Sequence, residues 1–196
     1  GPGQEREPRL EPLLQVLAGL SKRGVRLCFQ PGNRDFMLER LPGVSLERFD
    51  PRIRSWFEHR FGAPTEVQRL AWGPIADGRH VLITDPTGSG KTLTAFLWAL
   101  QQLATGAWEE GTTRVLYVSP LKALNADIER NLAEPLAGIA DAFRAAGGEL
   151  PRIRVAMRSG DTPPAERQRI VRQRPEILIT TPESLNLLVN SKAGPA

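Results

Sequence analysis

The sequence predicts an α/β fold in which a parallel β-sheet packs against flanking helices. From residue 80 onward, short apolar runs alternate with stretches of helical periodicity, which is typical of strands joined by crossover helices. The apolar runs are too continuous for a sheet with one wet face, so we expect strands that are buried on both sides. The four runs are Val81–Ile83, Val115–Val118, Ile153–Met157 and Ile177–Ile179.

Helices are expected between these strands, because apolar residues recur there at the three- and four-residue spacing of one helix face. Helical segments are also expected on both sides of Pro64. Helices of these lengths can cross over between parallel strands. The two clearest apolar stripes are Leu93, Phe96, Leu97, Leu100 and Leu103, and Leu121, Leu124, Ile128, Leu132 and Leu136.

A serine or threonine followed by proline recurs after the strands. This pair favours a helix start, since the hydroxyl caps the first turn and proline fits the first helical position. In a parallel sheet such starts lie at the carboxyl edge, where ligands bind. They are equally consistent with plain capping and with a row of N–H groups that meets phosphates. The three pairs are Ser119-Pro120, Thr162-Pro163 and Thr181-Pro182.

The first 48 residues are expected to form a small α+β extension that serves packing. Leucines at helical spacing over residues 10–20 predict a short amphipathic helix. Alternation at Val25, Leu27 and Phe29, followed by a Pro-Gly-Asn turn and a second short apolar run, predicts a β-hairpin. We expect the chemistry in a second domain, residues 49–196.

Composition places the chain among ordinary globular proteins. Its 196 residues carry a formal net charge of +4, with 24% charged and 40% hydrophobic residues. Mild basicity is compatible with an acidic partner such as nucleic acid. Cys28 is the single cysteine, which excludes an intrachain disulfide, and we expect a cytoplasmic, bacterial protein. No apolar run reaches the length of a membrane span, so no membrane partner is expected.

The segment Asp85–Thr92 reads D-P-T-G-S-G-K-T and lies between an apolar run and a helical stripe. This is the setting of a phosphate-binding loop, whose N–H groups surround a phosphate. Gly88 and Gly90 let the backbone approach closely. In such a loop Lys91 neutralises the outer phosphates and the Thr92 hydroxyl ligates Mg²⁺. An ordinary turn of the same composition would not need strand, loop and helix in register.

Asp85 stands where the full pattern G-x-x-x-x-G-K-[ST] has its first glycine. A carboxylate at this position would repel the oxygens of a triphosphate. The alternative is that the side chain points away from the nucleotide and has no effect. The sequence leaves both interpretations open.

Five short motifs occur in order between residues 49 and 191: P-T-E-V-Q, P-T-G-S-G-K-T, S-P-L-K-A-L-N, R-S-G-D-T and T-T-P-E-S-L. The series resembles the first RecA-like domain of superfamily 2 DEAD/DEAH-type helicases, most closely the large helicase-related, or Lhr-like, group. Asp85 and Ala126 depart from the family pattern, which usually has alanine and often asparagine at these positions. The resemblance implies an α/β fold that is part of a RecA-like P-loop NTPase domain, in an ATP-dependent DNA or RNA helicase.

The resemblance implies ATP and Mg²⁺ as ligands. Thr65 and Gln68 match the motif that reads adenine, and a glutamine amide offers the donor and the acceptor for that edge. Lys91 and Thr92 take the catalytic roles, with Thr92 on the metal. Phe61 either packs under the base or belongs to the core. The triphosphate cradle is formed by Thr87, Gly88, Ser89, Gly90, Lys91 and Thr92.

The resemblance also implies contacts with the sugar-phosphate backbone of nucleic acid, which carry little base specificity. For Lys122 the alternative is an ordinary surface lysine, and for Arg158 it is an ion pair with Asp161 or Glu166. The contact residues of the three motifs are Pro120, Leu121 and Lys122; Arg158, Gly160 and Asp161; and Thr181, Pro182 and Glu183.

The acidic tetrad that hydrolysis requires in this family does not follow any apolar run. We therefore expect an amino-terminal portion of a helicase, truncated before the Walker B strand, with negligible ATP hydrolysis alone. Its partners would be nucleic acid, the remainder of the first RecA-like domain and a second RecA-like domain. Val81–Ile83 would then present an unpaired sheet edge, with poor solubility or marginal stability as the consequence.

Two other functions agree with parts of the sequence. Loss of ATP use, with Asp85 as its sign, would leave a non-catalytic nucleic-acid-binding module. A P-loop ATPase unrelated to nucleic acid would explain the phosphate loop, but it leaves Gln68 and the three downstream motifs unexplained.

Overall fold

The computed structural model describes residues 26–29 and 46–190 apart from positions 84, 87 and 121, and it describes only the backbone at 26–29 and 122–124. The chain forms two compact units that interleave along the sequence. The sheet unit comprises residues 1–29, 111–125 and 154–196, and the helical unit comprises residues 30–110 and 126–153.

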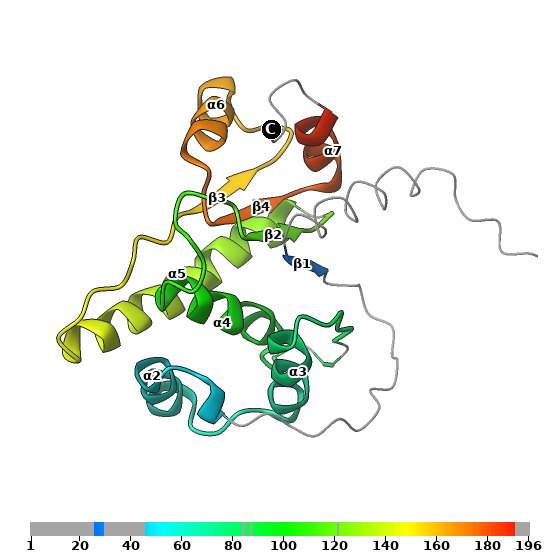
Figure 1. The fold of residues 1–196 in the computed structure, drawn as a ribbon. Coiled ribbons are helices and arrows are strands. Elements are labelled where there is room, and N and C mark those ends of the chain that lie inside the picture. The colour runs from blue at the N-terminus through cyan, green and yellow to red at the C-terminus, as the bar shows by residue number, and fades with distance from the viewer. Residues whose placement is uncertain (1–25, 30–45, 84, 87, 121, 191–196) are drawn as a thin grey trace, which may run out of the picture. The chain divides into compact units, whose positions relative to one another are not determined.

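Strands and helices alternate from β2 onward, as the sequence predicts (Figure 1). None of the described helices is long and apolar enough to cross a membrane. The strands are β1 Arg26–Phe29, β2 Val115–Val118, β3 Val155–Arg158 and β4 Ile177–Thr180. The helices are the short 3-10 helix η1 Leu46–Arg48, α2 Pro51–Phe61, α3 Glu66–Ala76, α4 Lys91–Ala104, α5 Lys122–Ala145, α6 Pro164–Gln173 and α7 Pro182–Asn190.

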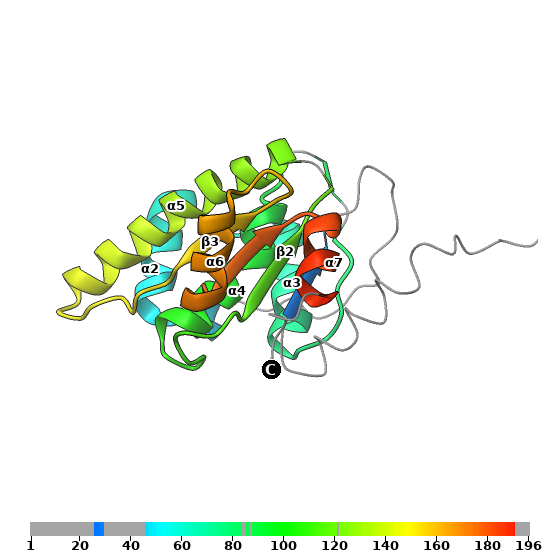
Figure 2. The same cartoon turned by 90° about the horizontal axis from the view of Figure 1, so that it is seen from above.

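The sheet unit is built on four parallel strands in the order β1-β2-β4-β3 (Figure 2). Every residue of β2 and β4 is buried, whereas β3, at the edge of the described sheet, is mostly half-buried. Ile170 of α6 and Leu185 of α7 join Leu116, Val118 and Leu178 in one apolar core. Both helices therefore pack on this sheet.

Three of the four predicted strands form, and one does not. β2 has its predicted bounds, β4 gains one residue, and β3 begins at Val155, two residues later than expected. The strand predicted at Val81–Ile83 is wrong: these residues form no strand, and Leu82 is 50% exposed. β2 pairs with β1 and β4 on its two sides, so neither of its edges is open to this segment. The unpaired sheet edge expected at Val81–Ile83 is therefore not formed.

β1 is the strand that alternation in the N-terminal extension predicts, but its described partner is not a hairpin arm. It pairs in parallel with β2, so that Cys28 lies opposite Tyr117. The second hairpin arm and the helix predicted over residues 10–20 lie outside the described residues. The domain boundary placed before residue 49 stays a prediction.

The helical unit has an aromatic core in which α2 and α3 meet. Trp72 is fully buried and contacts Phe49 and Phe57 edge-on, with ring centroids 4.9 and 5.5 Å apart. Phe57 in turn lies 5.1 Å from the ring of Phe61, the last residue of α2. Aromatic pairs of this kind favour particular orientations as well as burial. The core thus extends to the last residue of α2, after which Gly62 ends the helix with a φ of 76°.

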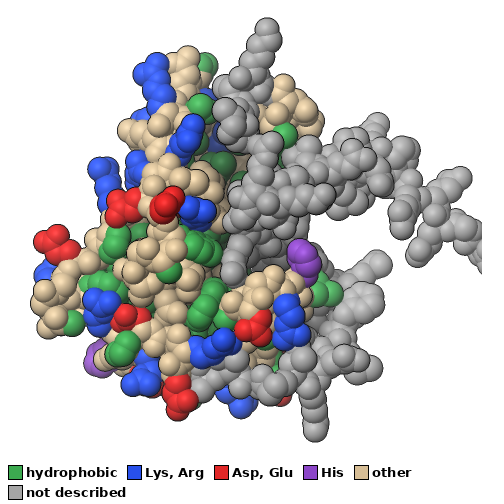
Figure 3. Space-filling view, in the orientation of Figure 1, with side chains coloured by type: hydrophobic (Ala, Val, Ile, Leu, Met, Phe, Trp, Pro, Cys, Tyr) green, Lys and Arg blue, Asp and Glu red, His purple; other side chains and the backbone are tan. Residues whose placement is uncertain are grey.

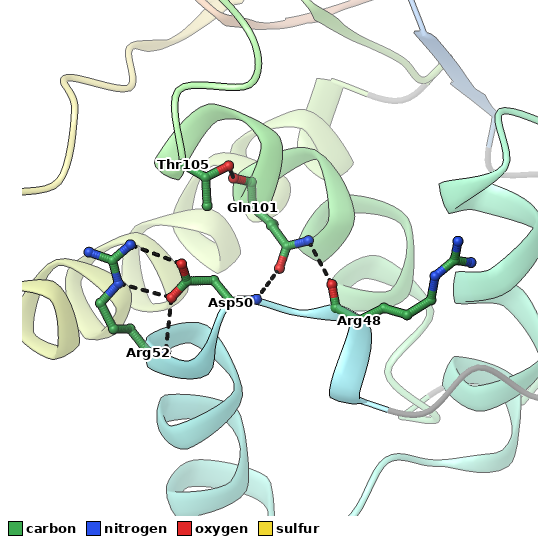
Figure 4. Close-up of polar contacts among 5 residues, drawn as sticks. All are labelled: Arg48, Asp50, Arg52, Gln101 and Thr105. Atoms are coloured by element: carbon green, nitrogen blue, oxygen red, sulfur yellow. Dashed lines mark hydrogen bonds and ion pairs between the residues drawn. The ribbon is translucent and has the colours of Figure 1, made fainter.

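A polar cluster fastens the start of α2 to α4 (Figure 4). The Gln101 side chain accepts a hydrogen bond from the Asp50 N–H at 2.6 Å and donates one to the Arg48 carbonyl at 3.2 Å. Asp50 caps α2 by accepting from the Arg52 N–H, and it binds the Arg52 guanidinium through two further bonds of 2.9 Å. Since α4 begins at the phosphate loop, the cluster positions α2 relative to that loop.

Candidate nucleotide and nucleic-acid sites

The phosphate loop leads into α4 through a helix start without a side-chain cap. Gly90 is the N-cap residue, with a left-handed φ of 85°, and among the described residues no side chain bonds the first-turn N–H groups. These groups carry the positive end of the helix dipole, which suits an anion. A Cβ added to Gly90 would lie 2.7 Å from Gln68 Nε2. The backbone conformation therefore favours glycine, and a side chain at this position would also displace the Gln68 amide.

Lys91, the first residue of α4, folds back over the phosphate loop. Its ammonium donates to the backbone carbonyls of Asp85 at 2.5 Å and Pro86 at 2.6 Å. Carbonyls are neutral acceptors, so these bonds hold the ammonium over the loop without neutralising its charge. Charged oxygens of a phosphate are stronger acceptors and would replace them.

Thr65 and Gln68 form a capping box at the start of α3. The Thr65 hydroxyl accepts from the Gln68 N–H at 3.4 Å, and Gln68 Oε1 accepts from the Thr65 N–H at 2.9 Å. The same hydroxyl donates to the Ser89 carbonyl at 3.1 Å, which fastens α3 to the phosphate loop. Gln68 is 4% exposed and uses its amide oxygen locally. The adenine contact of these residues stays a prediction, and it depends on the Nε2 group.

A pocket of about 430 Å³ opens beside the loop within the helical unit. Gly88, Gly90 and Thr92 line it from the loop and the start of α4, and Thr65 and Gln68 line it from α3. Its volume lies in the range of small-molecule sites. The structure therefore brings these predicted nucleotide residues together around one cavity.

Phe61 borders the same pocket from the end of α2. Its ring contacts Phe57 in the aromatic core but is 44% exposed. It is therefore neither a fully buried core residue nor separate from the core, and a ring face at a pocket rim can stack on a base. Thr87, which the sequence assigns to the triphosphate cradle, lies outside the described residues.

Helix α5 supplies a pocket wall that the sequence did not predict. Arg130, Asn131 and Glu134 line the pocket, and Glu134 accepts a bond of 2.6 Å from Arg60 near the end of α2. Arg130 pairs with Asp127 on its own helix. These residues belong to none of the five motifs, and helical periodicity predicts only that they lie on the polar side of α5. Only the tertiary structure places them at the pocket.

Asp85 is exposed, and the group that Lys91 binds is its backbone carbonyl. Replacing Asp85 with alanine is expected to tighten ATP binding by about three- to tenfold, because it removes a negative charge from a loop that must receive a triphosphate. The Lys91 bond survives, since it involves the backbone. Titration of a fluorescent ATP analogue into the chain and the variant measures the change.

Asp85→Asn is the matched control for size, since it removes the charge but keeps nearly the same shape. It should bind the nucleotide as tightly as the alanine variant. Unchanged binding in both variants would show that the carboxylate points away from the nucleotide, and weaker binding in both would show that the carboxylate supports the site instead of repelling the triphosphate.

The sheet unit brings the predicted nucleic-acid motifs to one edge. Val118, Arg158 and Thr180 are aligned at the carboxyl ends of β2, β3 and β4. The Ser119 N–H then bonds the Thr180 carbonyl at 3.0 Å. The connections after these strands therefore begin side by side, as the sequence predicts. The motif residues 119–120 and 159–162 lie in these connections, Thr181 links β4 to α7, and residues 182–183 form the start of α7.

The helix start predicted at Thr181 is confirmed. α7 begins at Pro182, and the Thr181 hydroxyl accepts from the Ser184 N–H at 3.3 Å. The start predicted at Thr162 is wrong by one residue, because α6 begins at Pro164. Instead of capping α6, the Thr162 hydroxyl accepts from the Ser159 N–H at 2.8 Å and closes the turn after β3.

The helix start predicted after β2 also shifts. α5 begins at Lys122, two residues after the expected first position at Pro120. Pro120 itself is exposed in the connection between β2 and α5. Leu121 and the side chain of Lys122 lie outside the described residues, so the contacts assigned to them stay predictions.

Arg158 is a buried cation at this edge, with 8% of its surface exposed. Its Nε has no hydrogen-bond partner among the described residues. Burial lowers the pKa of the Arg158 guanidinium, and the charge of Arg167 lowers it further. The ion pairs considered from the sequence, with Asp161 or Glu166, do not form within the described part of the chain, where Glu166 binds Arg169. A buried guanidinium in these surroundings favours an external anion.

The phosphate loop before α4 and the aligned ends of the parallel strands are features of a P-loop protein. DEAD/DEAH box helicases match this chain over residues 65–194, a range that contains the phosphate loop and the three later motifs. The chain belongs to the DEAD/DEAH box helicase family.

Relatives within this family carry the Lhr name. The Lhr helicase/probable uracil glycosylase of Mycolicibacterium smegmatis is 52% identical over 149 residues, which cover 76% of this chain and 10% of that protein. The Lhr helicase/uracil glycosylase of Escherichia coli is 48% identical over 152 residues, which cover 74% and 10%. The predicted resemblance to the Lhr-like group is confirmed. The chain spans about a tenth of the length of these curated relatives.

Solved helicase structures have the same fold. The structure of Mycobacterium smegmatis helicase Lhr bound to ssDNA and AMP-PNP matches with a TM-score of 0.71 and 51% identity, over 76% of this chain and 19% of that one. The DUF1998 helicase MrfA bound to DNA and AMPPNP matches with a TM-score of 0.59 and 29% identity, over 72% and 18%. The predicted RecA-like α/β fold is confirmed.

Proposed function

We propose that the chain is the ATP-binding and nucleic-acid-binding portion of an ATP-dependent helicase. The observation that carries the proposal is the uncapped start of α4, where Lys91 lies over the phosphate loop beside a pocket lined by Thr92 and Gln68. A relative from Methanocaldococcus jannaschii is named ATP-dependent helicase Lhr-Core. The matched M. smegmatis structure is described as bound to ssDNA and AMP-PNP. These names support ATP and nucleic acid as the ligands of this chain.

In the proposed nucleotide site, each residue has a separate task. The N–H groups of the loop and of the first turn of α4 surround the β-phosphate. Lys91 exchanges its carbonyl acceptors for oxygens of the β- and γ-phosphates, while Thr65 and Gln68 lie at the adenine end. Thr92 would hold Mg²⁺ together with phosphate oxygens, and the ion neutralises phosphate charge.

The proposed metal site relies on the nucleotide for most of its ligands. The described residues contain no group of three or more histidine, cysteine, aspartate or glutamate side chains that could hold a metal ion. Mg²⁺ prefers oxygen ligands and is usually bound by one or two protein groups plus substrate phosphates. A single hydroxyl from Thr92 beside a triphosphate fits this preference.

In the proposed nucleic-acid site, a sugar-phosphate backbone follows the carboxyl edge of the sheet. The contacts come from the predicted residues at or just after the ends of β2, β3 and β4, and Arg158, the last residue of β3, is the buried charge among them. Because these contacts would reach sugar and phosphate, we expect little dependence on base sequence. Thr181 already uses its hydroxyl to cap α7, so the backbone N–H groups and Glu183 remain for this contact.

We propose that ATP turnover depends on further parts of a helicase chain. Lys91 and Thr92 supply charge stabilisation, but phosphoryl transfer also needs a group that orients the attacking water. The remainder of the first RecA-like domain and a second RecA-like domain would provide such groups. The 196 residues alone should therefore bind ATP and hydrolyse it negligibly.

Two titrations at one stated salt concentration test the proposal. One follows a fluorescent ATP analogue, and the other follows the anisotropy of a labelled single-stranded oligothymidylate. We expect binding in both. Binding of ATP without the strand would indicate a P-loop ATPase unrelated to nucleic acid. Binding of the strand without ATP would indicate a non-catalytic nucleic-acid-binding module.

Gly160→Ala separates a functional glycine from a structural one. A Cβ added to Gly160 would meet no atom within 4 Å, and its φ lies outside the left-handed region, so the fold does not require glycine there. We expect the melting temperature to change little, while affinity for single-stranded DNA falls by about tenfold because a strand must pass close to this backbone. If the variant bound DNA as tightly as the unsubstituted chain, Gly160 would not be part of the contact. A large fall in melting temperature would show that its role is structural.

A further inference from the structure

The turn after β3 is held from α6 by Arg167. The Nε of Arg167 donates to the Thr162 carbonyl at 2.7 Å, and its Nη2 donates to the Gly160 carbonyl at 2.5 Å. The turn is also closed from within, since the Thr162 hydroxyl accepts from the Ser159 N–H and the Ser159 hydroxyl accepts from the Asp161 N–H at 3.3 Å. The backbone after β3 thus has a defined shape, and Arg167 is part of what defines it.

Arg158 and Arg167 place two positive charges on this one turn. Arg158 ends β3, and the charge of Arg167 adds to burial in lowering the pKa of its guanidinium. The ion pairs of the described residues include neither arginine, and the nearby Glu166 binds Arg169. Two like charges repel each other, and an anion between or beside them makes the arrangement more favourable.

Phosphate is the anion that these donors fit. Arginine presents a planar set of N–H groups that bind phosphate oxygens in pairs, and two guanidinium groups can share one phosphate. The Nε of Arg158 has no partner among the described residues, and the two carbonyl bonds of Arg167 leave further N–H groups for a ligand. Gly160 is exposed and offers access, and basic side chains gather over α6 (Figure 3).

We propose that Arg158 and Arg167 form a two-arginine seat for one phosphate of a single-stranded nucleic-acid backbone. Arg158 belongs to a motif assigned to the nucleic-acid contact, whereas Arg167 belongs to none and is a new contact. The inference rests on the proposed function, which brings a strand to this edge of the sheet. In the seat, Arg167 both holds the turn and supplies the second cation.

Salt-dependent binding of oligothymidylate tests the two-arginine seat. Anisotropy titrations over a series of salt concentrations compare the chain with Arg158→Ala, Arg167→Ala and the double variant. Each single variant should lose about tenfold in affinity, and the double variant less than about thirtyfold, because both side chains serve one phosphate. The slope of log K against log salt should fall by about 0.7 in the double variant, the value for one phosphate of a single strand.

Arg172→Ala is the matched control, since Arg172 is an exposed arginine in the last turn of the same helix. Its affinity for oligothymidylate should remain within about twofold of that of the unsubstituted chain. Should Arg167→Ala fail to fold, Arg167→Lys provides the measurement, because it keeps the charge without the paired N–H geometry. It should retain the salt slope and lose several-fold in affinity.

Five outcomes would overturn the seat. If Arg167→Ala binds the strand like Arg172→Ala, Arg167 is not part of the phosphate contact. The same follows if Arg167→Lys binds like the unsubstituted chain. Both results leave the proposed function intact. Losses that multiply to about a hundredfold, with a slope change of about 1.4, would show two separate phosphates. A chain that does not bind the strand but melts at higher temperature in inorganic phosphate would have a free-phosphate site instead. A chain that binds neither would refute the nucleic-acid part of the proposed function as well.

Discussion

Replacing Glu176 with alanine is expected to lower the free energy of unfolding by about 3–5 kcal/mol, because it leaves buried donors and a guanidinium without their acceptor. The Glu176 carboxylate is 1% exposed. Its Oε1 accepts from the Gly111 N–H at 2.7 Å and from Arg154 Nη2 at 2.8 Å, and its Oε2 accepts from the Arg154 N–H at 2.8 Å. One side chain therefore attaches the segments before β2 and β3 to the start of β4.

The same bonds make stability depend on pH. Burial raises the pKa of Glu176, but hydrogen bonds from Arg154 and Gly111 outweigh it and lower the pKa from its ordinary value of 4.5 to about 2. In the unfolded chain the carboxylate takes up its proton at higher pH. The stabilisation is therefore fully present above about pH 4.5 and is lost as the pH falls toward 2. It amounts to at most about 3 kcal/mol.

Urea titrations at pH 7 and at lower pH measure both effects. Glu176→Gln should lower the free energy of unfolding at pH 7, because its amide NH₂ would face N–H donors. Its stability should also fall less steeply between about pH 4.5 and 2. Glu166→Ala is the control in the same unit, because Glu166 forms a partly exposed ion pair with Arg169 that should contribute less than about 1 kcal/mol. Equal unfolding midpoints for the two alanine variants would contradict this role of Glu176.

The sequence predicts strands well where burial alone decides them. β2 and β4 are continuous apolar runs in the middle of the sheet, and their predicted bounds hold to within one residue. Val81–Ile83 is equally apolar but forms no strand, because strand pairing depends on a neighbour that periodicity does not identify. Alternation likewise predicts that residues 26–29 are extended, but not that they pair in parallel with β2.

For the sites too, the sequence predicts features that depend on neighbouring residues but not features that depend on tertiary contacts. The phosphate loop could be predicted because its glycines, Lys91 and Thr92 are adjacent in sequence and act through local backbone geometry. The turn after β3 could not, because Thr162 can bond either the next helix or its own turn and the structure favours the turn. Arg167 and Glu176 gain their roles only from tertiary contacts, and neither lies in a motif.

Lys91→Met is expected to weaken ATP binding by about a hundredfold or more. A charged hydrogen bond that is lost together with its Coulomb attraction typically costs 2–5 kcal/mol, and a hundredfold corresponds to about 2.7 kcal/mol. Methionine keeps the length and the apolar stem of the side chain, so the start of α4 should stay folded. The ammonium that bonds the carbonyls of Asp85 and Pro86 is lost, and with it the positive charge over the loop.

Titration of the fluorescent ATP analogue with and without Mg²⁺ measures the loss, with Arg79→Met as the matched control. Arg79 is an exposed cation of the same helical unit that does not line the pocket, so removing it changes the net charge equally. Nucleotide affinity should change by less than about twofold in Arg79→Met, because exposed charges outside the site are screened by salt.

If both variants weakened ATP binding equally, the effect would come from net charge. If Lys91→Met bound ATP like the unsubstituted chain, the loop would not be the triphosphate site. Binding of single-stranded DNA should be the same in both variants, because the proposed strand contacts belong to the sheet unit.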